Sequence, residues 1–168
     1  MKLLLTLILV LTGAPLVDTS MPNQVPSVPQ TIKTCMQVPK LKAYTIDSRV
    51  NPYYLRGDFD GDGKPDVAVM VLGPRSKSTG LVVCESDGRS FVLGAGSQPT
   101  FSTIRDDNFL SSEWEVLTPT EFRNMLYDKK LGDAAKGEVI SLNWEDGNAY
   151  IYWDGSSYRW FSEPAGGK

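Results

Sequence analysis

The sequence predicts a mainly β protein, built as a single antiparallel β domain of the meander or sandwich type with one short helix. Two observations lead to this fold class. Short apolar runs are separated by turn signals such as Asp-Gly, which is typical of antiparallel strands joined by tight turns. Only one stretch, from Pro119 to about Tyr127, has helical character.

Four strands are expected in the first half of the domain. Tyr53 to Arg56 leads into an acidic loop, and Val67 to Leu72 leaves this loop as a continuously apolar run. Such a run is typical of a strand covered on both faces. Leu81 to Glu85 and Ser90 to Leu93 then form a hairpin around an Asp-Gly turn, so the first half is expected to be a meander.

The second half is expected to contain four further strands and the helix. Trp114 to Leu117 is a short strand, after which Thr118 can cap a helix that has Pro119 in its first position and Glu121 in its first turn. The buried side of this helix is predicted to be Phe122, Met125 and Leu126. Asp-Gly turns connect the last three strands, at residues 138–144, 149–153 and 158–161.

The N-terminus has the layout of an export signal. In residues 1–20, Lys2 precedes an apolar run and then small residues, as in a secretory signal peptide whose cleavage position is left open. A Pro-rich tether at residues 21–30 leads to a single domain at residues 31–168. We therefore expect a secreted or periplasmic protein that meets the membrane only through its signal peptide. An uncleaved anchor is the alternative, although the apolar run is shorter than the ~20 residues that span a bilayer.

The chain has two cysteines, Cys35 and Cys84. An exported protein enters an oxidising compartment, where a pair of cysteines is more often bridged than free. We therefore predict a Cys35–Cys84 disulfide. Two buried, unpaired thiols are the alternative if the protein is not exported.

Composition excludes several classes of function. The chain contains no histidine, which removes serine-histidine and cysteine-histidine nucleophiles and nearly every catalytic zinc site. Lysine and arginine are scattered and the net charge is -3, so the basic patch of a nucleic-acid-binding protein is missing. No nucleic-acid partner is expected.

The acidic loop GDFDGDGKPD is the clearest candidate site. Its carboxylates occupy loop positions one, three, five and nine, at Asp58, Asp60, Asp62 and Asp66. Calcium binds six to eight oxygens, and alternate residues of a tight turn can direct their oxygens to one point. Gly63 allows the sharp turn, and the Lys64 carbonyl is the expected backbone ligand. We predict a bound calcium ion, because closely spaced carboxylates repel one another without a cation; a solvated acidic turn is the alternative.

The segment GDFDGDGKPDVAV also resembles the FG-GAP or VCBS-type repeat, the calcium loop that joins strands in integrin-like β-propeller blades. The resemblance covers about residues 54–72, and it implies the same calcium ligands: Asp58, Asp60, Asp62, the Lys64 carbonyl and Asp66. An EF-hand would have a bidentate Glu at position twelve, where this chain has Val69. Because the chain has one copy, a partial propeller-like sheet is the most that the resemblance predicts.

Aromatic residues near the C-terminus form a second candidate site. They lie on the last predicted strands and are Trp144, Tyr150, Tyr152, Trp153, Tyr158 and Trp160. Tyrosine and tryptophan supply much of the binding energy at recognition surfaces, so these rings are a possible ligand surface. The alternative is that they pack in the core, since aromatic residues favour strands.

The predicted function is that of a non-catalytic, calcium-stabilised binding or interaction module that recognises a glycan or a cell-envelope protein. No catalytic residue is assigned. Glu113 and Glu115 would share one face of a strand, and paired carboxylates can perform acid–base work without histidine. A carboxylate-type glycan hydrolase is therefore the first alternative, and an inhibitor or immunity-type protein is another.

Overall fold

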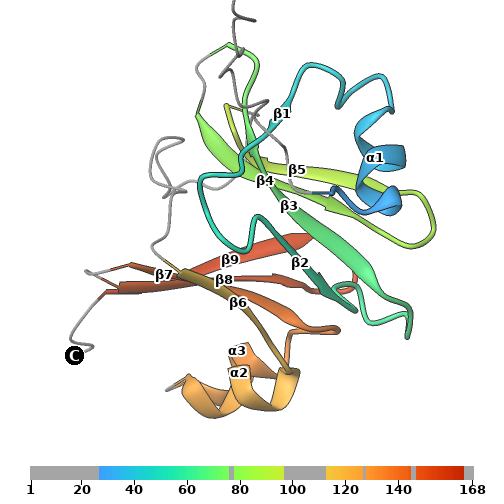
Figure 1. Ribbon diagram of the computed structural model, residues 1–168. Coiled ribbons are helices and arrows are strands. Elements are labelled where there is room, and N and C mark those ends of the chain that lie inside the picture. Colours follow the sequence, from blue (N-terminus) through green and yellow to red (C-terminus); the bar gives the residue numbers. More distant parts are fainter. Residues whose placement is uncertain (1–26, 76–77, 97–112, 127, 145–146, 165–168) are drawn as a thin grey trace, which may run out of the picture.

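The computed structural model describes residues 27–75, 78–96, 113–126, 128–144 and 147–164, and it contains two antiparallel β-sheets with a few short helices (Figure 1). The mainly β fold class is thus confirmed. The predicted signal peptide, most of the tether and Tyr127 lie outside the described residues. No helix in the described ranges is long and apolar enough to cross a membrane.

The first sheet is centred on one long strand. Its five strands are β1 (Thr45–Ile46), β2 (Tyr54–Gly57), β3 (Asp66–Leu72), β4 (Thr79–Cys84) and β5 (Ser90–Gly94). β3 pairs with β4 on one side, while β1 and β2 pair with successive parts of its other side. The predicted meander from β2 to β5 is therefore confirmed, and β1 is an addition that the sequence pattern did not indicate.

The second sheet is a four-stranded meander in the order β6-β7-β8-β9. The strands are β6 (Glu113–Leu117), β7 (Val139–Trp144), β8 (Gly147–Trp153) and β9 (Tyr158–Pro164). In the part of the chain that the structure describes, three helices lie outside the sheets: α1 (Gln30–Met36), α2 (Pro119–Met125) and α3 (Lys129–Gly132). α2 is the predicted helix, whereas α1 and α3 were not anticipated.

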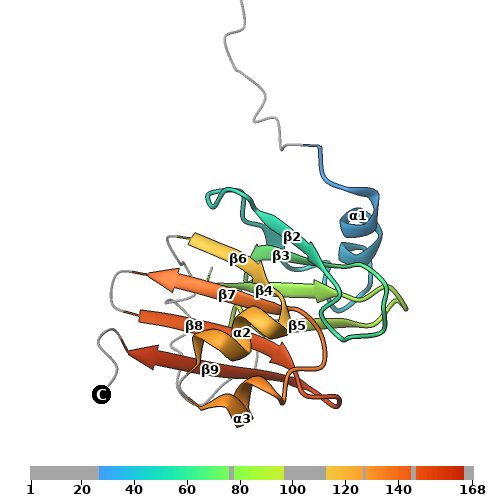
Figure 2. The ribbon, with the colours of Figure 1, turned by 90° about the horizontal axis from the view of Figure 1, so that it is seen from below.

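The elements form layers, with α1 outside the first sheet and α2 and α3 outside the second (Figure 1). Seen along the perpendicular direction, α2 lies over β7 and β8 (Figure 2). The central strands β3 and β4 of the first sheet and β7 and β8 of the second are therefore covered on both faces. This explains why β3 and β4 are buried along almost their whole length, as the continuously apolar sequence of β3 predicted.

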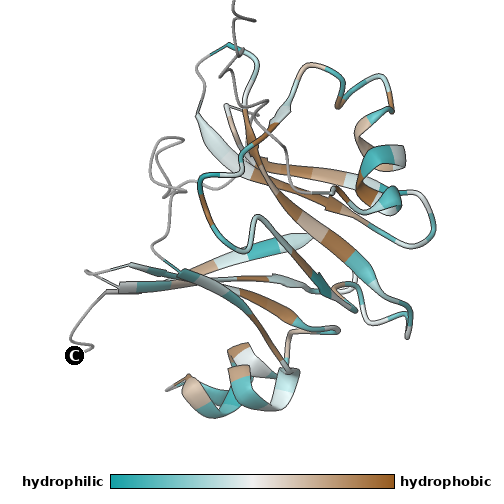
Figure 3. Cartoon of the chain, viewed as in Figure 1, coloured by the Kyte–Doolittle hydropathy of each residue, from teal (hydrophilic) through white to brown (hydrophobic). Residues whose placement is uncertain are grey.

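Alternation along β3 divides the core in two. Ala68 and Met70 point toward the second sheet, where they pack with Phe59 and residues of β7 and β8. Val67, Val69 and Val71 point the other way and pack against α1 and the segment that follows it. The apolar run is visible as the brown length of β3 (Figure 3). β3 is consequently the strand that both cores share.

A third core lies under α2. Thr118 caps the helix by the predicted capping box with Glu121, and Phe122 and Leu126 pack on Tyr150 of β8. The prediction that Met125 is buried is wrong, because 51% of this residue is exposed. The helix ends at Met125, and Leu126 returns to the core from an extended backbone rather than from a further helical turn.

The predicted disulfide between Cys35 and Cys84 is present. It joins α1 to the last residue of β4 and closes a loop with a sequence separation of 49 residues. A crosslink of this span stabilises a fold by about 4 kcal/mol in the chain-entropy model. The N-terminal helix is thereby fixed covalently to the first sheet.

The structure separates the six aromatic residues of the candidate ligand surface. Tyr150, Tyr152, Trp153 and Tyr158 are buried, so these four rings belong to the core and cannot form an exposed platform. Trp144 and Trp160 are half-buried and stack with ring centroids 6.3 Å apart. The cause is the layered architecture, because aromatics on either face of β8 meet a covering layer.

Truncating a buried ring should therefore cost folding stability. We expect Trp153→Ala to lower the free energy of unfolding by about 3 to 5 kcal/mol, because it removes a large side chain packed between the sheets. Met125→Ala is the control and should change stability by less than about 0.5 kcal/mol. Equilibrium unfolding in urea measures both, and a small loss for Trp153→Ala would mean that this ring is not part of the core.

Candidate metal centre

The acidic loop connects two paired strands. It begins at Asp58, directly after β2, and ends at Asp66, the first residue of β3. Gly57 and Asp66 are register partners, so the two ends of the loop are held side by side by the sheet. A chain fixed at both ends in this way has few ways to arrange the residues between, which favours a closed loop with its side chains directed inward.

Three carboxylates converge inside the loop. Oxygen atoms of Asp58, Asp60 and Asp66 all lie within 4.8 Å of one another. Calcium–oxygen distances are about 2.3 to 2.6 Å, so two oxygens bound to the same ion are at most about 5 Å apart. The separation in this protein therefore fits a single calcium ion between the three side chains.

Backbone hydrogen bonds inside the loop direct the carboxylates. The Asp62 N–H donates to Asp60 Oδ1 at 3.0 Å, and the Gly63 N–H donates to Asp58 Oδ2 at 2.9 Å. Gly61 and Gly63 adopt positive φ angles of 77° and 85°, a region that glycine enters without steric cost. The loop therefore curls around its own acidic side chains.

Asp66 is the most firmly held of these groups. Its Oδ2 accepts from the Phe59 N–H at 2.9 Å and its Oδ1 accepts from the Ser86 N–H at 2.8 Å. The residue is buried, and this burial, together with the nearby charge of Asp60, raises the pKa of the Asp66 carboxyl above its usual range. A cation beside Asp66 would offset that unfavourable environment.

Asp58 provides the observation that points most directly to a ligand. Its Oδ1 atom is buried and has no hydrogen-bond partner among the described residues. A buried polar atom that makes no interaction carries a penalty of about 1 to 3 kcal/mol, and more when it is charged. Coordination of a metal ion would remove this penalty, and a carboxylate oxygen is a ligand that calcium prefers. The donor set therefore fits this ion.

The loop is also docked against the second sheet. The Asp58 N–H donates to Glu138 Oε2 at 2.8 Å, and the Glu138 N–H donates to the Asp58 carbonyl oxygen at 2.7 Å. The chains approach so closely that a Cβ atom added at Gly61 would lie 2.1 Å from the Lys136 carbonyl oxygen. The loop consequently bridges β3 of the first sheet and the segment that enters β7 of the second.

A cationic side chain reaches the cluster from the turn between β4 and β5. Arg89 Nη2 lies 2.7 Å from Asp60 Oδ2 and 2.8 Å from Glu85 Oε2. The Glu85 side chain is 0% exposed, and its other oxygen accepts from the Tyr158 hydroxyl at 3.1 Å. Burial raises the pKa of Glu85 to about 7. This corner of the molecule therefore holds one arginine among several acidic groups.

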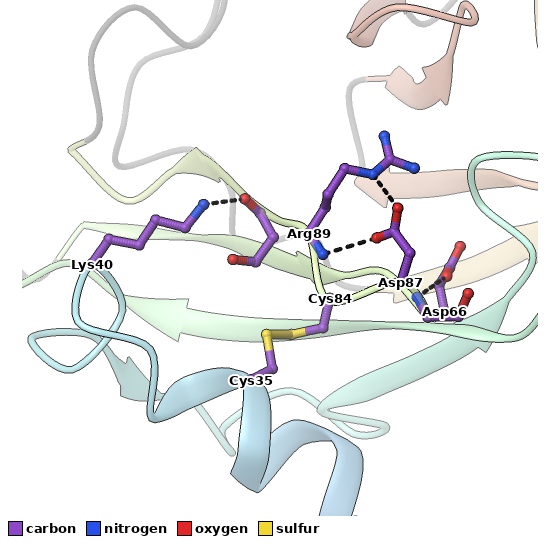
Figure 4. Close-up of a disulfide and its surroundings, with 8 residues drawn as sticks. Cys35, Lys40, Asp66, Cys84, Asp87 and Arg89 are labelled. Carbon is purple, nitrogen blue, oxygen red and sulfur yellow. Dashed lines mark hydrogen bonds and ion pairs between the residues drawn. A yellow bond between two sulfur atoms is a disulfide. The ribbon is translucent and has the colours of Figure 1, made fainter.

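The disulfide lies beside the same turn. Figure 4 shows Cys84 bonded to Cys35, with Asp87 and Arg89 on the turn just beyond and Asp66 nearby. Ser86, two residues after Cys84, donates the backbone hydrogen bond to Asp66. The covalent link thus fixes the strand end that orients one of the three converging carboxylates.

Two other predicted ligands stand outside this group of three. Asp62 is exposed and accepts from the Lys64 N–H at 2.8 Å, a hydrogen bond that lowers the pKa of Asp62. Its role as a calcium ligand, and that of the Lys64 carbonyl, remain predictions. No local pattern in the sequence marks Glu85, Arg89 or Glu138 as neighbours of the loop. These residues reach it only through tertiary structure.

Glu113 and Glu115 lie where the sequence placed them, on β6 with the buried Trp114 between them. Both are exposed, which is the ordinary position of acidic residues on the solvated side of a strand. The structure does not bring them into the acidic loop, whose converging carboxylates come from the β2–β3 connection.

No family model, curated protein or solved structure matches this chain in the three comparisons with known proteins. What the acidic loop binds is therefore inferred from its own atoms.

Proposed function

We propose that this protein is an exported, non-catalytic interaction module whose fold is stabilised by one calcium ion in the loop from Asp58 to Asp66. Two observations carry the proposal: carboxylate oxygens of Asp58, Asp60 and Asp66 converge, and Asp58 Oδ1 is buried without a hydrogen-bond partner among the described residues. Asp58, Asp60 and Asp66 supply oxygen ligands, and Asp62, the Lys64 carbonyl and water complete the coordination shell. Magnesium suits the loop less well, because it demands near-octahedral geometry at shorter distances.

A structural role for calcium follows from the position of the loop. The backbone of Asp58 exchanges hydrogen bonds with Glu138 at the entrance to β7, so the loop connects the two sheets. Binding the ion removes the repulsion between the carboxylates and stabilises the conformation that makes this connection. The expected effect of calcium is therefore on the stability of the whole domain.

A hollow beside the loop supports an interaction function. It has a volume of about 430 Å³, and it lies between α1 and the β4–β5 turn. Polar side chains of Thr31, Thr34 and Ser86 line it together with Arg89 and the apolar Val38. Small-molecule sites commonly measure about 300 to 1,000 Å³ and combine apolar walls with a few polar groups. We propose that this hollow receives a sugar unit of a glycan or a side chain of a cell-envelope protein.

Calcium should raise the melting temperature, and a chelator should lower it. At a concentration about ten times the dissociation constant, the ion would stabilise the fold by about 1.4 kcal/mol, a shift of about 5 °C. Asp58→Asn keeps the shape of the side chain but removes its charge, so this variant should lose the calcium response. Asp133→Asn, at an exposed ion pair with Arg123, is the matched control and should keep it.

Differential scanning calorimetry and isothermal titration with calcium or magnesium measure this response. If the melting temperature of the wild-type protein ignores both calcium and chelator, the loop is only an acidic turn and the proposal fails.

Export predicts a processed and oxidised chain. Mass spectrometry of the protein from its native host should show an N-terminus downstream of Gly13. It should also show a peptide pair containing Cys35 and Cys84 that separates only after reduction, because exported cysteine pairs are oxidised. An intact Met1 together with two free thiols would contradict export.

Filling the hollow should block recognition without unfolding the protein. Thr34 is exposed on α1 and lines the hollow, so Thr34→Trp should abolish binding to the glycans that the wild-type protein retains on a glycan array. Thr45→Trp, at the exposed first residue of β1, is the control and should bind normally. Equal binding by both variants would place recognition elsewhere on the molecule.

A further inference from the structure

We propose that Arg89 is a tethered competitor of calcium: in the calcium-free protein its guanidinium group neutralises Asp60 and Glu85, and it thereby lowers the affinity of the loop for the ion. This inference rests on the proposed function and concerns the regulation of the same site. It assigns a role to a residue that neither the loop motif nor its spacing indicates.

Arg89 satisfies two buried acidic groups. Its Nη2 atom lies 2.7 Å from Asp60 Oδ2 and 2.8 Å from Glu85 Oε2. The side chains of Asp60 and Glu85 are 5% and 0% exposed, whereas that of Arg89 is 46% exposed. Buried anions are unstable unless they are paired. Arg89 therefore reaches from the surface to stabilise charges that solvent cannot.

The arginine is held in this position by independent contacts. Asp87 accepts hydrogen bonds from the Arg89 Nε at 2.5 Å and from its backbone N–H at 2.9 Å (Figure 4). The guanidinium carbon also lies 5.6 Å from the centroid of the Trp153 ring, within the range of a cation–π interaction. Because the side chain is already ordered, little conformational entropy is lost when it pairs with Asp60.

Calcium and Arg89 compete for the same carboxylate. Asp60 uses Oδ1 for the Asp62 N–H and Oδ2 for Arg89, so calcium would have to share or take an oxygen that Arg89 occupies. Given calcium–oxygen distances of about 2.4 Å, an ion bound to Asp60 would lie roughly 5 to 6 Å from the guanidinium group, and the two charges would repel each other. Even with the dielectric constant of water, this repulsion corresponds to about a tenfold loss of affinity. Removing the arginine should therefore tighten calcium binding.

Arg89→Gln tests the inference by isothermal titration with calcium. We expect this variant to bind calcium about tenfold more tightly than the wild-type protein and to melt at a lower temperature when calcium is absent. The two effects have opposite signs because the arginine stabilises the empty loop and opposes the ion. General loss of structure would instead weaken both properties together.

Arg159→Gln is the matched control. Arg159 forms an equivalent pair with Asp154, at 2.5 Å, in the Asp-Gly turn between β8 and β9, but it makes no ion pair with the acidic loop. This substitution changes the net charge by the same amount. It should leave the calcium dissociation constant within about twofold of the wild-type value, because Arg159 is exposed and its charge is screened by solvent and salt.

A measurement on the wild-type protein covers the case in which Arg89→Gln does not fold. In nuclear magnetic resonance spectra, the Nε–H signal of Arg89 should shift with the same midpoint as the loop amides during a calcium titration, while that of Arg159 should not. If the wild-type protein binds no calcium, the proposed function fails and takes this inference with it. If the wild-type protein binds calcium while Arg89→Gln binds equally or more weakly, or the Arg89 signal does not move, only the role of Arg89 is overturned.

Discussion

Burial of β3 on both faces is the constraint on which the rest of this structure depends. Three strands pair with β3, one of its faces forms the core between the sheets, and the other packs against α1. A strand in this position cannot shift by one residue without exchanging Met70 for the valines on the opposite face. Its first residue, Asp66, is consequently fixed in space. The acidic loop ends at that residue. Apolar packing of β3 therefore fixes the position of one carboxylate of the candidate metal centre.

The three carboxylates of the acidic loop differ in burial and in the partners that balance their charge. Asp66 is fully buried, Asp58 has one buried oxygen, and Asp60 pairs with Arg89. Local hydrogen bonds within the loop can hold these carboxylates in place but cannot neutralise them, because the donors are uncharged backbone groups. While they are ionised, their charge is balanced by a cation, either Arg89 or one from solution. This division between positioning and neutralisation explains how a closed acidic loop can exist before an ion arrives.

The sequence predicted the features that depend on neighbouring residues. The strands from β2 to β9 and the capping box of α2 follow from local patterns of apolar residues, Asp-Gly turns and caps, and the disulfide was predicted from a pair of cysteines that follows a signal-like N-terminus. The burial of Trp153 and Tyr158 could not be predicted in this way. Alternation along a strand shows that its two faces differ, but not whether both faces are covered by other elements. Glu138 and Glu85 were missed for a related reason. Glu138 meets the loop 80 residues away in the chain, and no local pattern marks it.

The backbone contact between Asp58 and Glu138 has a consequence for how the domain can open. The Asp58–Glu138 backbone contact holds the loop to the second sheet and the Ser86–Asp66 hydrogen bond holds it to the first, so a separation of the sheets at this end would break the Asp58–Glu138 contact. Trp144 lies at the other end of β7, where its ring stacks on that of Trp160, and both residues are only partly covered. Partial unfolding that begins there would leave the acidic end intact.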